Sequence, residues 1–211
     1  MQPITYPVQF TVDYPNHPLN KITTAFRFFV AIPIFIVLAT LTASNSNTSN
    51  HPSNYTLYIA GGSGLLVLGP LLMIVVRQKY PRWWFDWNRE LLRFINRVFA
   101  FMALLDDQYP STDEQQSVHL DFAYPEMPSG LNQWLPLVKW FLAIPHYFVL
   151  VFLNVALVFV VIYAWFAILF TGHYPQSMFD FVVGVMRWNN RVIAYAFILV
   201  TDEYPPFRLS N

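Results

Sequence analysis

The 211-residue sequence has no cysteine and few charged residues. The absence of cysteine excludes disulfides, thiolate metal sites, iron–sulfur clusters and cysteine nucleophiles. Charged residues make up 11% of the chain and hydrophobic residues 55%, whereas a soluble domain carries about 25% charged residues. This charge is too little to cover a water-exposed surface, so we expect lipid to cover part of the protein. The formal net charge is +0, which argues against a nucleic-acid partner.

Motifs of catalysis and cofactor binding are also missing. The sequence has no Ser/His/Asp order, no phosphate-binding glycine loop and no carboxylates at metal-ligand spacing, so we expect no enzyme, no metal and no cofactor. Only His146 lies deep in an apolar segment, while His173 lies at the end of one, and a haem with two histidine ligands is therefore not expected. Residues 1–20 lack a basic segment followed by an apolar one, so no cleavable signal peptide is predicted.

Tyr-Pro dipeptides recur in a matched order along the chain. Their tyrosines form two triplets: Tyr14, Tyr80 and Tyr109, then Tyr124, Tyr174 and Tyr204. Residues 26–33 match residues 138–145, and residues 96–98 match residues 190–192. Ordered matches of this kind predict a tandem duplication, with one copy in residues 1–112 and the other in residues 113–211.

Each copy opens with alternating apolar and polar residues, at 8–12 and at 118–122. This alternation predicts a short β-strand with one buried face, and the two strands could pair. In the first copy, residues 22–43 and 57–76 are mainly apolar, and each is long enough to cross about 30 Å of hydrocarbon. A polar Ser/Asn loop separates them, so we predict a membrane-spanning helical hairpin.

The second copy lacks most of that polar loop, and its residues 134–171 form one apolar run. This run is either a tight hairpin of two spans, 134–153 and 155–171, or one long kinked helix. Because the first copy divides at the matching place, we predict the hairpin. Pro33 and Pro145 occupy matching positions and should each kink a helix, since proline removes a backbone hydrogen bond.

A third helix is predicted in each copy, at residues 83–105 and 178–200. The first contains five charged residues: Asp86, Arg89, Glu90, Arg93 and Arg97. Each would cost about 2.5–3.5 kcal/mol at the centre of a bilayer. Both third helices are therefore predicted to be amphipathic helices at the membrane surface.

These elements together predict an all-α membrane protein of two tandem repeats. Each repeat is a transmembrane helical hairpin plus an interfacial amphipathic helix, preceded by a short β-strand. Since the basic residues fall on one side, the positive-inside rule predicts a multi-pass protein with cytoplasmic termini. The repeats would be related by an axis near the membrane normal. No acidic residue lies in the predicted spans, which makes a proton relay difficult to build.

The third helices share a stripe of Asp, Arg and Arg at positions i, i+7 and i+11, on one helix face. The stripes are Asp86, Arg93 and Arg97 beside Asn96, and Asp180, Arg187 and Arg191 beside Asn190. Two interpretations remain open: the arginines bind anionic lipid headgroups, or Asp–Arg pairs brace the helices. One basic residue near the start of the first span of each copy, Arg27 or Lys139, could also reach headgroups. The candidate lipid-binding residues are thus Arg93, Arg97, Arg187, Arg191, Arg27 and Lys139.

The second copy carries motifs that resemble a known family. They are LVKWFLAIPH at 137–146, AWFAILFTG at 164–172, FDFVVGV at 179–185 and TDEYPPF at 201–207. These motifs are similar to the bacterial membrane family catalogued as domain of unknown function 4389, over nearly all of residues 118–207. The first copy resembles the family in a diverged form, with a longer Ser/Asn loop and a more charged third helix. The resemblance implies a bacterial inner (cytoplasmic) membrane protein and supplies no catalytic residue.

We therefore predict a non-catalytic integral membrane protein, an accessory or scaffold subunit of a larger membrane assembly or a homo-oligomer. Its expected partners are membrane lipids, anionic ones in particular, and other membrane subunits or further copies of the chain. The alternative is a protein that binds lipid headgroups or transports a small solute and uses the paired arginine stripes.

Overall fold

Helices dominate the computed structural model, which describes residues 6–42, 62–112, 114–125 and 131–210. In chain order the elements are β1 (Val8–Val12), α1 (Lys21–Ala25), α2 (Arg27–Val30), α3 (Ile32–Thr42), α4 (Gly62–Arg77), α5 (Arg82–Met102), β2 (Val118–Phe122), α6 (Pro136–Leu142), α7 (Ile144–Thr171), α8 (Gln176–Ile193) and the π-helix η1 (Ala194–Ile198).

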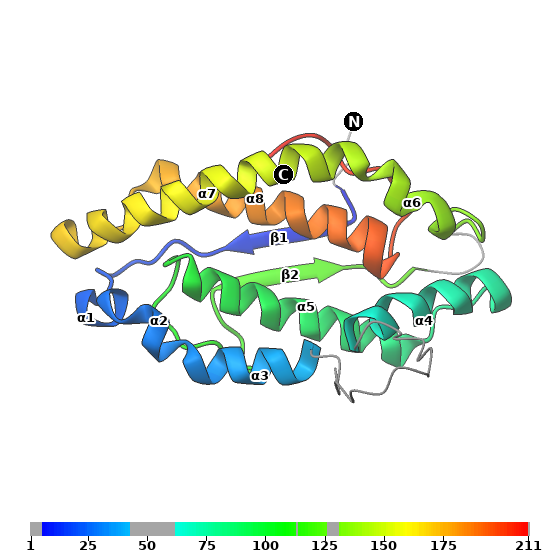
Figure 1. Cartoon of the computed structure of the whole chain (residues 1–211), viewed down its shortest axis with the longest axis horizontal. Helices are drawn as coiled ribbons and strands as arrows, with labels where there is room; N and C mark the ends of the chain where they lie inside the picture. Colours follow the sequence, from blue (N-terminus) through cyan, green and yellow to red (C-terminus); the bar gives the residue numbers. More distant parts are fainter. Residues whose placement is uncertain (1–5, 43–61, 113, 126–130, 211) are drawn as a thin grey trace, which may run out of the picture.

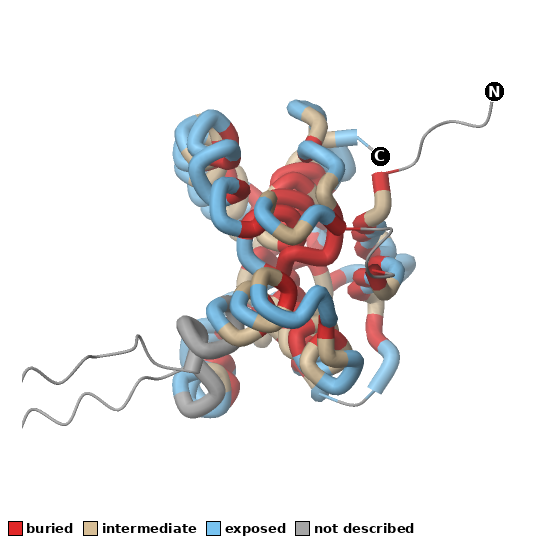
Figure 2. Tube along the Cα trace, turned by 90° about the vertical axis from the view of Figure 1, so that its right-hand side faces the viewer, coloured by how far each residue is buried: buried red, intermediate tan, exposed pale blue. Residues whose placement is uncertain are grey.

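These elements stack in three layers, seen from the front in Figure 1 and edge-on in Figure 2. Helices α1–α4, α6 and α7 form the front layer, α5 and α8 the middle layer, and the ribbon of β1 and β2 the back layer. The ribbon packs on the middle layer, where β2 contacts α5 and β1 contacts α8. The main hydrophobic core fills the space between these layers, with Phe10 and Leu120 from the strands against Phe85 and Val182 from the helices.

The two predicted strands are confirmed, and they pair with each other. They are antiparallel, and Phe10 faces Leu120 at the centre of the register. Along each strand buried and exposed residues alternate, because successive side chains point to opposite faces. One face of the ribbon is therefore part of the core, and the opposite face carries the exposed polar residues Gln9, Thr11, His119 and Asp121.

The predicted proline kinks are also confirmed. Helix α2 ends at Val30 and α3 begins at Ile32, and in the second half α6 ends at Leu142 and α7 begins at Ile144. The breaks fall just before Pro33 and Pro145, which cannot donate a backbone hydrogen bond to the preceding turn.

The hairpin predicted within residues 134–171 is wrong. Helix α7 runs unbroken for 28 residues, and Asn154, where the turn was predicted, lies inside it and donates to the carbonyl of Leu150 at 2.8 Å. No glycine or proline occurs between His146 and Thr171, so nothing in this segment breaks the helix. Among the described residues, α7 is the one helix long and apolar enough to cross a membrane. In the first half, the predicted Ser/Asn loop and the start of the predicted second span lie outside the described residues.

The predicted third helices correspond to α5 and to α8 with its continuation η1. Both lie in the middle layer, where one side of each helix covers the ribbon. Their ends match as well: Leu104 and Leu199 each adopt a φ of 64°, a left-handed conformation that stops a helix. The described structure thus places these amphipathic helices inside the molecule, between the ribbon and the front layer.

Candidate functional site

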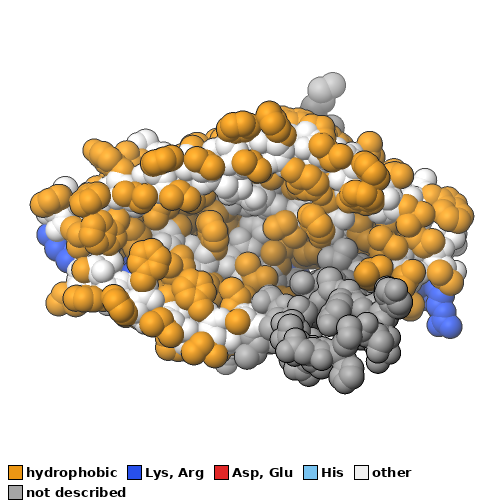
Figure 3. Space-filling model, viewed as in Figure 1, with side chains coloured by type: hydrophobic (Ala, Val, Ile, Leu, Met, Phe, Trp, Pro, Cys, Tyr) orange, Lys and Arg blue, Asp and Glu red, His pale blue; other side chains and the backbone are white. Residues whose placement is uncertain are grey.

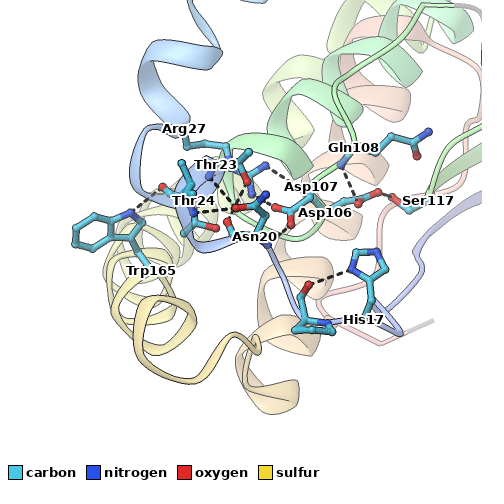
Figure 4. A network of polar contacts seen from close by, with 12 residues as sticks. His17, Asn20, Thr23, Thr24, Arg27, Asp106, Asp107, Gln108, Ser117 and Trp165 are labelled. Atoms are coloured by element: carbon cyan, nitrogen blue, oxygen red, sulfur yellow. Dashed lines mark hydrogen bonds and ion pairs between the residues drawn. The ribbon is translucent and has the colours of Figure 1, made fainter.

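A buried ion pair joins the first helices to the end of α5. Arg27 is 2% exposed, and its Nη2 lies 2.7 Å from Oδ1 of Asp107. Its Nη1 donates to the backbone carbonyl of Asp106 at 2.8 Å, and its guanidinium lies over the ring of Phe101. The other carboxylate oxygen of Asp107 accepts from the backbone N–H of Asn20 at 2.5 Å. Figure 4 shows how these groups converge beside Trp165 of α7.

The same arrangement occurs in the second half, at matching positions. Lys139 is 0% exposed, and its Nζ lies 2.7 Å from Oδ1 of Asp202. It also donates to the carbonyl of Thr201 at 2.7 Å, and Asp202 accepts from the backbone N–H of Asn132 at 2.5 Å. The ring of Tyr195 lies 5.2 Å from the ammonium. Each half therefore ties the start of its front layer to the end of its middle-layer helix.

The prediction that Arg27 and Lys139 bind lipid headgroups is therefore wrong. Their charged groups are buried and face internal carboxylates and carbonyls. A buried charge is tolerated when it is paired and hydrogen-bonded, and both conditions are met here. The sequence analysis missed the acidic partners. A signal for them existed, since Asp107 and Asp202 each stand two residues before a Tyr-Pro dipeptide.

Two arginines of the stripes hold the ribbon. Nε of Arg93 donates to the carbonyl of Leu120 at 2.7 Å, and Nε of Arg187 donates to the carbonyl of Phe10 at 3.0 Å. Each arginine thus bonds the central residue of the strand that belongs to the other half of the chain. Asp86 pairs with Arg89 at 3.3 Å rather than with a stripe arginine.

The arginines of α8 contact the C-terminal segment, which comprises residues 199–210 after η1. Arg187 donates to the carbonyl of Leu209 at 2.7 Å, and Arg191 to those of Arg208 at 3.1 Å and Ser210 at 2.8 Å. Arg191 is buried. Its burial, followed by the positive charges of Arg187 and Arg208, lowers its pKa to about 10. Backbone carbonyls rather than carboxylates therefore stabilise this guanidinium.

The matching place on α5 is an open cavity of about 280 Å³. Arg93 and Arg97 line it together with His119 and Asp121. Arg97 donates to the carbonyl of Ser111 at 2.7 Å, and Nη1 of Arg93 lies 2.7 Å from Glu90. Of the six candidate lipid-binding residues, Arg93 and Arg97 line this cavity together, whereas Arg27 lines a different, mainly apolar cavity of about 250 Å³ beside Phe28 and Trp165. Nearby carboxylates reduce the positive charge of the cavity beside Arg93 and Arg97, so it suits a group with a single negative charge better than a multiply charged anion.

Asparagine side chains join the helices near the middle of the molecule. Asn96 and Asn190 exchange two hydrogen bonds, of 2.8 and 2.7 Å, between α5 and α8. Asn154 of α7 and Asn189 of α8 face each other in the same way at 3.4 and 3.3 Å. All four line a cavity of about 170 Å³. Because each amide has a partner, these polar groups can lie close to an apolar environment.

Histidines and carboxylates form no group that could hold a metal ion among the described residues. His146 is buried, and its Nδ1 accepts from Nε1 of Trp188 at 3.0 Å. Its ring stacks on Phe207, with 4.0 Å between the ring centroids. The described surroundings of this histidine are therefore those of a packed aromatic residue.

The front layer carries a continuous set of exposed hydrophobic side chains, which we call the apolar face. It consists of the exposed hydrophobic side chains of α1–α4, α6 and α7, among them Phe28, Phe35, Leu72, Phe148, Phe159 and Phe166. Figure 3 shows this face, on which the described Lys and Arg side chains appear only at the two ends and no described Asp or Glu is visible. Soluble proteins rarely expose apolar patches of more than a few hundred Å².

Comparison with known proteins finds one family. Residues 136–208, from α6 to the C-terminal segment, match the family described as Domain of unknown function (DUF4389). No curated protein and no solved structure matches the chain.

Proposed function

We propose that this chain is a non-catalytic membrane protein that serves as a structural or accessory subunit in a bacterial cytoplasmic membrane. The observation that carries the proposal is the apolar face, whose exposed phenylalanine and aliphatic side chains require a non-aqueous environment. If water surrounded the protein instead, it would contact a hydrophobic surface that spans the whole front layer.

Internal pairing of the charged groups supports a structural role. The most deeply buried charges, Arg27, Lys139 and Arg191, all contact groups of the chain itself. A catalytic or transport site usually holds perturbed polar groups ready for a ligand, whereas these groups connect helices, loops and the C-terminal segment. They stabilise the fold in the way expected of a scaffold.

A duplicated architecture is part of the proposal, and matched contacts support it. Arg27 and Lys139 make the same ion pair in the two halves. Tyr14 donates to the carbonyl of Tyr174, and Tyr124 donates to that of Tyr80. The two halves thus exchange equivalent bonds, as two copies related by a two-fold axis would.

Lipid binding is the second candidate function, and the cavity beside Arg93 and Arg97 favours it. The guanidinium groups of both stripe arginines of α5 line this open cavity, and arginine binds phosphate oxygens with good geometry. Under this hypothesis the cavity holds the phosphate of one anionic headgroup.

Native mass spectrometry after gentle detergent extraction from the native membrane tests the proposal. We expect the chain in the membrane fraction after a high-salt wash, and either bound to other polypeptides at fixed stoichiometry or as a homo-oligomer. A chain recovered in the aqueous fraction would contradict membrane residence. A monomer that retains one anionic lipid class, and loses it in Arg97→Ala but not in the control Arg89→Ala, would favour the lipid-binding function instead.

A further inference from the structure

We infer that the apolar face lies within a single leaflet of the bilayer, with the helix axes parallel to the membrane plane and the ribbon in water. This inference rests on the proposed membrane residence and specifies its geometry. Figures 1 and 3 share one view, straight onto the apolar face, and in that view α3, α4, α6 and α7 run across the face rather than end on it. The face therefore offers the sides of helices to its surroundings.

The thickness of the front layer fits one leaflet. A single layer of α-helices with side chains is about 10–12 Å thick, and one leaflet supplies half of a hydrocarbon core of about 30 Å. Crossing along the helix axis fits less well, since the 28 residues of α7 extend about 42 Å. An orientation in the membrane plane sets no limit on helix length.

The back layer requires water. The ribbon lies near the middle of the long axis of the molecule (Figure 1) and exposes Thr11 and Asp121, and Asp13, which directly follows β1, is exposed as well. If the helices crossed the membrane along their axes, these side chains would lie at the depth of the hydrocarbon, at a cost of about 2.5–3.5 kcal/mol for each charge near the centre. A two-stranded ribbon also has open backbone edges, which are not found in contact with lipid.

Charges at the rim of the apolar face support the same orientation. Lys21 is exposed at the start of α1, and Arg77, Lys79 and Arg82 are exposed around the turn from α4 to α5, at the opposite end of the molecule (Figure 1). In the plane of the membrane, all four lie at headgroup level on one side, where basic residues attract anionic lipids. If the helices crossed along their axes, the two ends would lie on opposite sides and divide the basic residues, against the positive-inside rule.

Single-cysteine labelling tests the inference directly, because the natural chain has no cysteine. The variants are Lys79→Cys and His173→Cys at the two ends, Asp121→Cys on the ribbon, and Val155→Cys on the exposed side of α7. Positions 79, 173 and 121 are probed in sealed vesicles of both orientations with a membrane-impermeant maleimide. Position 155 receives a nitroxide spin label in detergent before reconstitution, because a thiol in hydrocarbon forms no reactive thiolate. Its collisions with molecular oxygen, which concentrates in hydrocarbon, and with a water-soluble, membrane-impermeant nickel chelate are then compared. We expect positions 79, 173 and 121 to react from one and the same side. The nitroxide at position 155 should collide with oxygen and not with the nickel chelate.

The other outcomes overturn the inference in distinguishable ways. Labelling of positions 79 and 173 from opposite sides means that the helices cross the membrane. Collision of the nitroxide at position 155 with nickel chelate added on the side opposite to position 121 means that the chain forms the hairpin expected from sequence. In both cases the chain still resides in the membrane, so the proposed function survives. If the nitroxide at position 155 collides with neither oxygen nor the nickel chelate, a partner protein covers the face. If the chelate reaches it from the side of position 121, water covers the face and the proposed function fails as well.

Discussion

Buried charges decide much of this structure at the scale of single residues. Arg27 and Lys139 differ in chemistry, yet each pairs with an aspartate that precedes a Tyr-Pro dipeptide. Lysine and arginine both carry long apolar stems, which allow the charge to reach a partner across a helix packing interface. The consequence is structural, since each pair connects the front layer to the end of a middle-layer helix.

The variant Asp202→Ala should be strongly destabilised, because it leaves the ammonium of Lys139 buried without a counter-ion. We expect the unfolding free energy to fall by about 3–5 kcal/mol, measured by unfolding of the detergent-solubilised protein. The double variant Lys139→Met with Asp202→Asn is the matched control, since it removes both charges and keeps an acceptor for the backbone of Asn132. It should recover most of the loss. Equal stability of Asp202→Ala and the parent would show that the pair does not stabilise the fold.

Stability should also decrease in alkaline solution. Burial is the main cause that raises the pKa of Tyr6, Tyr80 and Tyr174 in the folded chain, whereas an unfolded tyrosine ionises near a pH of about 10. Above that pH the unfolded chain binds fewer protons than the folded one, so the unfolding free energy decreases as pH rises. Below it, these tyrosines add no pH dependence.

Denaturant unfolding at a series of pH values through and above the tyrosine range measures this slope. Tyr80→Phe removes one of the three groups and should make the slope shallower, even though the variant also loses the bond from the hydroxyl to the carbonyl of Ile198. A slope that is the same in Tyr80→Phe and the parent would contradict the assignment.

At the scale of the helices and strands, α5 and α8 connect the other elements to each other. Both helices contact the ribbon on one side, and the buried pair of Asn96 and Asn190 joins them to each other. Their arginines hold the strands and the C-terminal segment through backbone carbonyls. Polar residues that in sequence suggest a membrane surface thus serve as internal connections between elements.

Gly184 of α8 tests how the C-terminal segment is held. A Cβ atom at this position would lie 2.9 Å from Cβ of Leu209, so Gly184→Ala should displace the segment and separate it from Arg187 and Arg191. We expect faster proteolytic cleavage within residues 207–210 and a decrease of about 1–3 kcal/mol in the unfolding free energy. Combining it with Leu209→Gly removes the clashing atom and should restore part of the loss. Unchanged proteolysis of Gly184→Ala would mean that the segment tolerates the methyl group.

At the scale of the whole molecule, the three layers separate apolar from polar surface. The front layer carries the apolar face, and the back layer carries exposed polar strand residues such as Gln9 and His119. A protein built in this way has one side suited to hydrocarbon and the opposite side suited to water. The labelling experiment with cysteines at positions 79, 121, 155 and 173 addresses this scale, since it reports which sides of the whole molecule face lipid and which face water.

Local features of the fold were predictable from sequence alone. The strands at 8–12 and 118–122 follow from alternating polarity, the breaks before Pro33 and Pro145 follow from the missing backbone donor, and the amphipathic helices follow from the spacing of their charges. These properties depend on residues close together in the chain, so a short window of sequence contains the information that determines them.

Tertiary structure decided which groups meet. Whether Lys139 faces a headgroup or Asp202 depends on where residues far apart in sequence come together, and no local pattern contains that distance. The continuity of α7 through Asn154 was decided in a similar way, because an amide that bonds both its own helix and Asn189 of α8 needs no turn to reach a polar partner. Desolvation makes such choices decisive, since a buried polar group without a partner costs more free energy than a local sequence preference can supply.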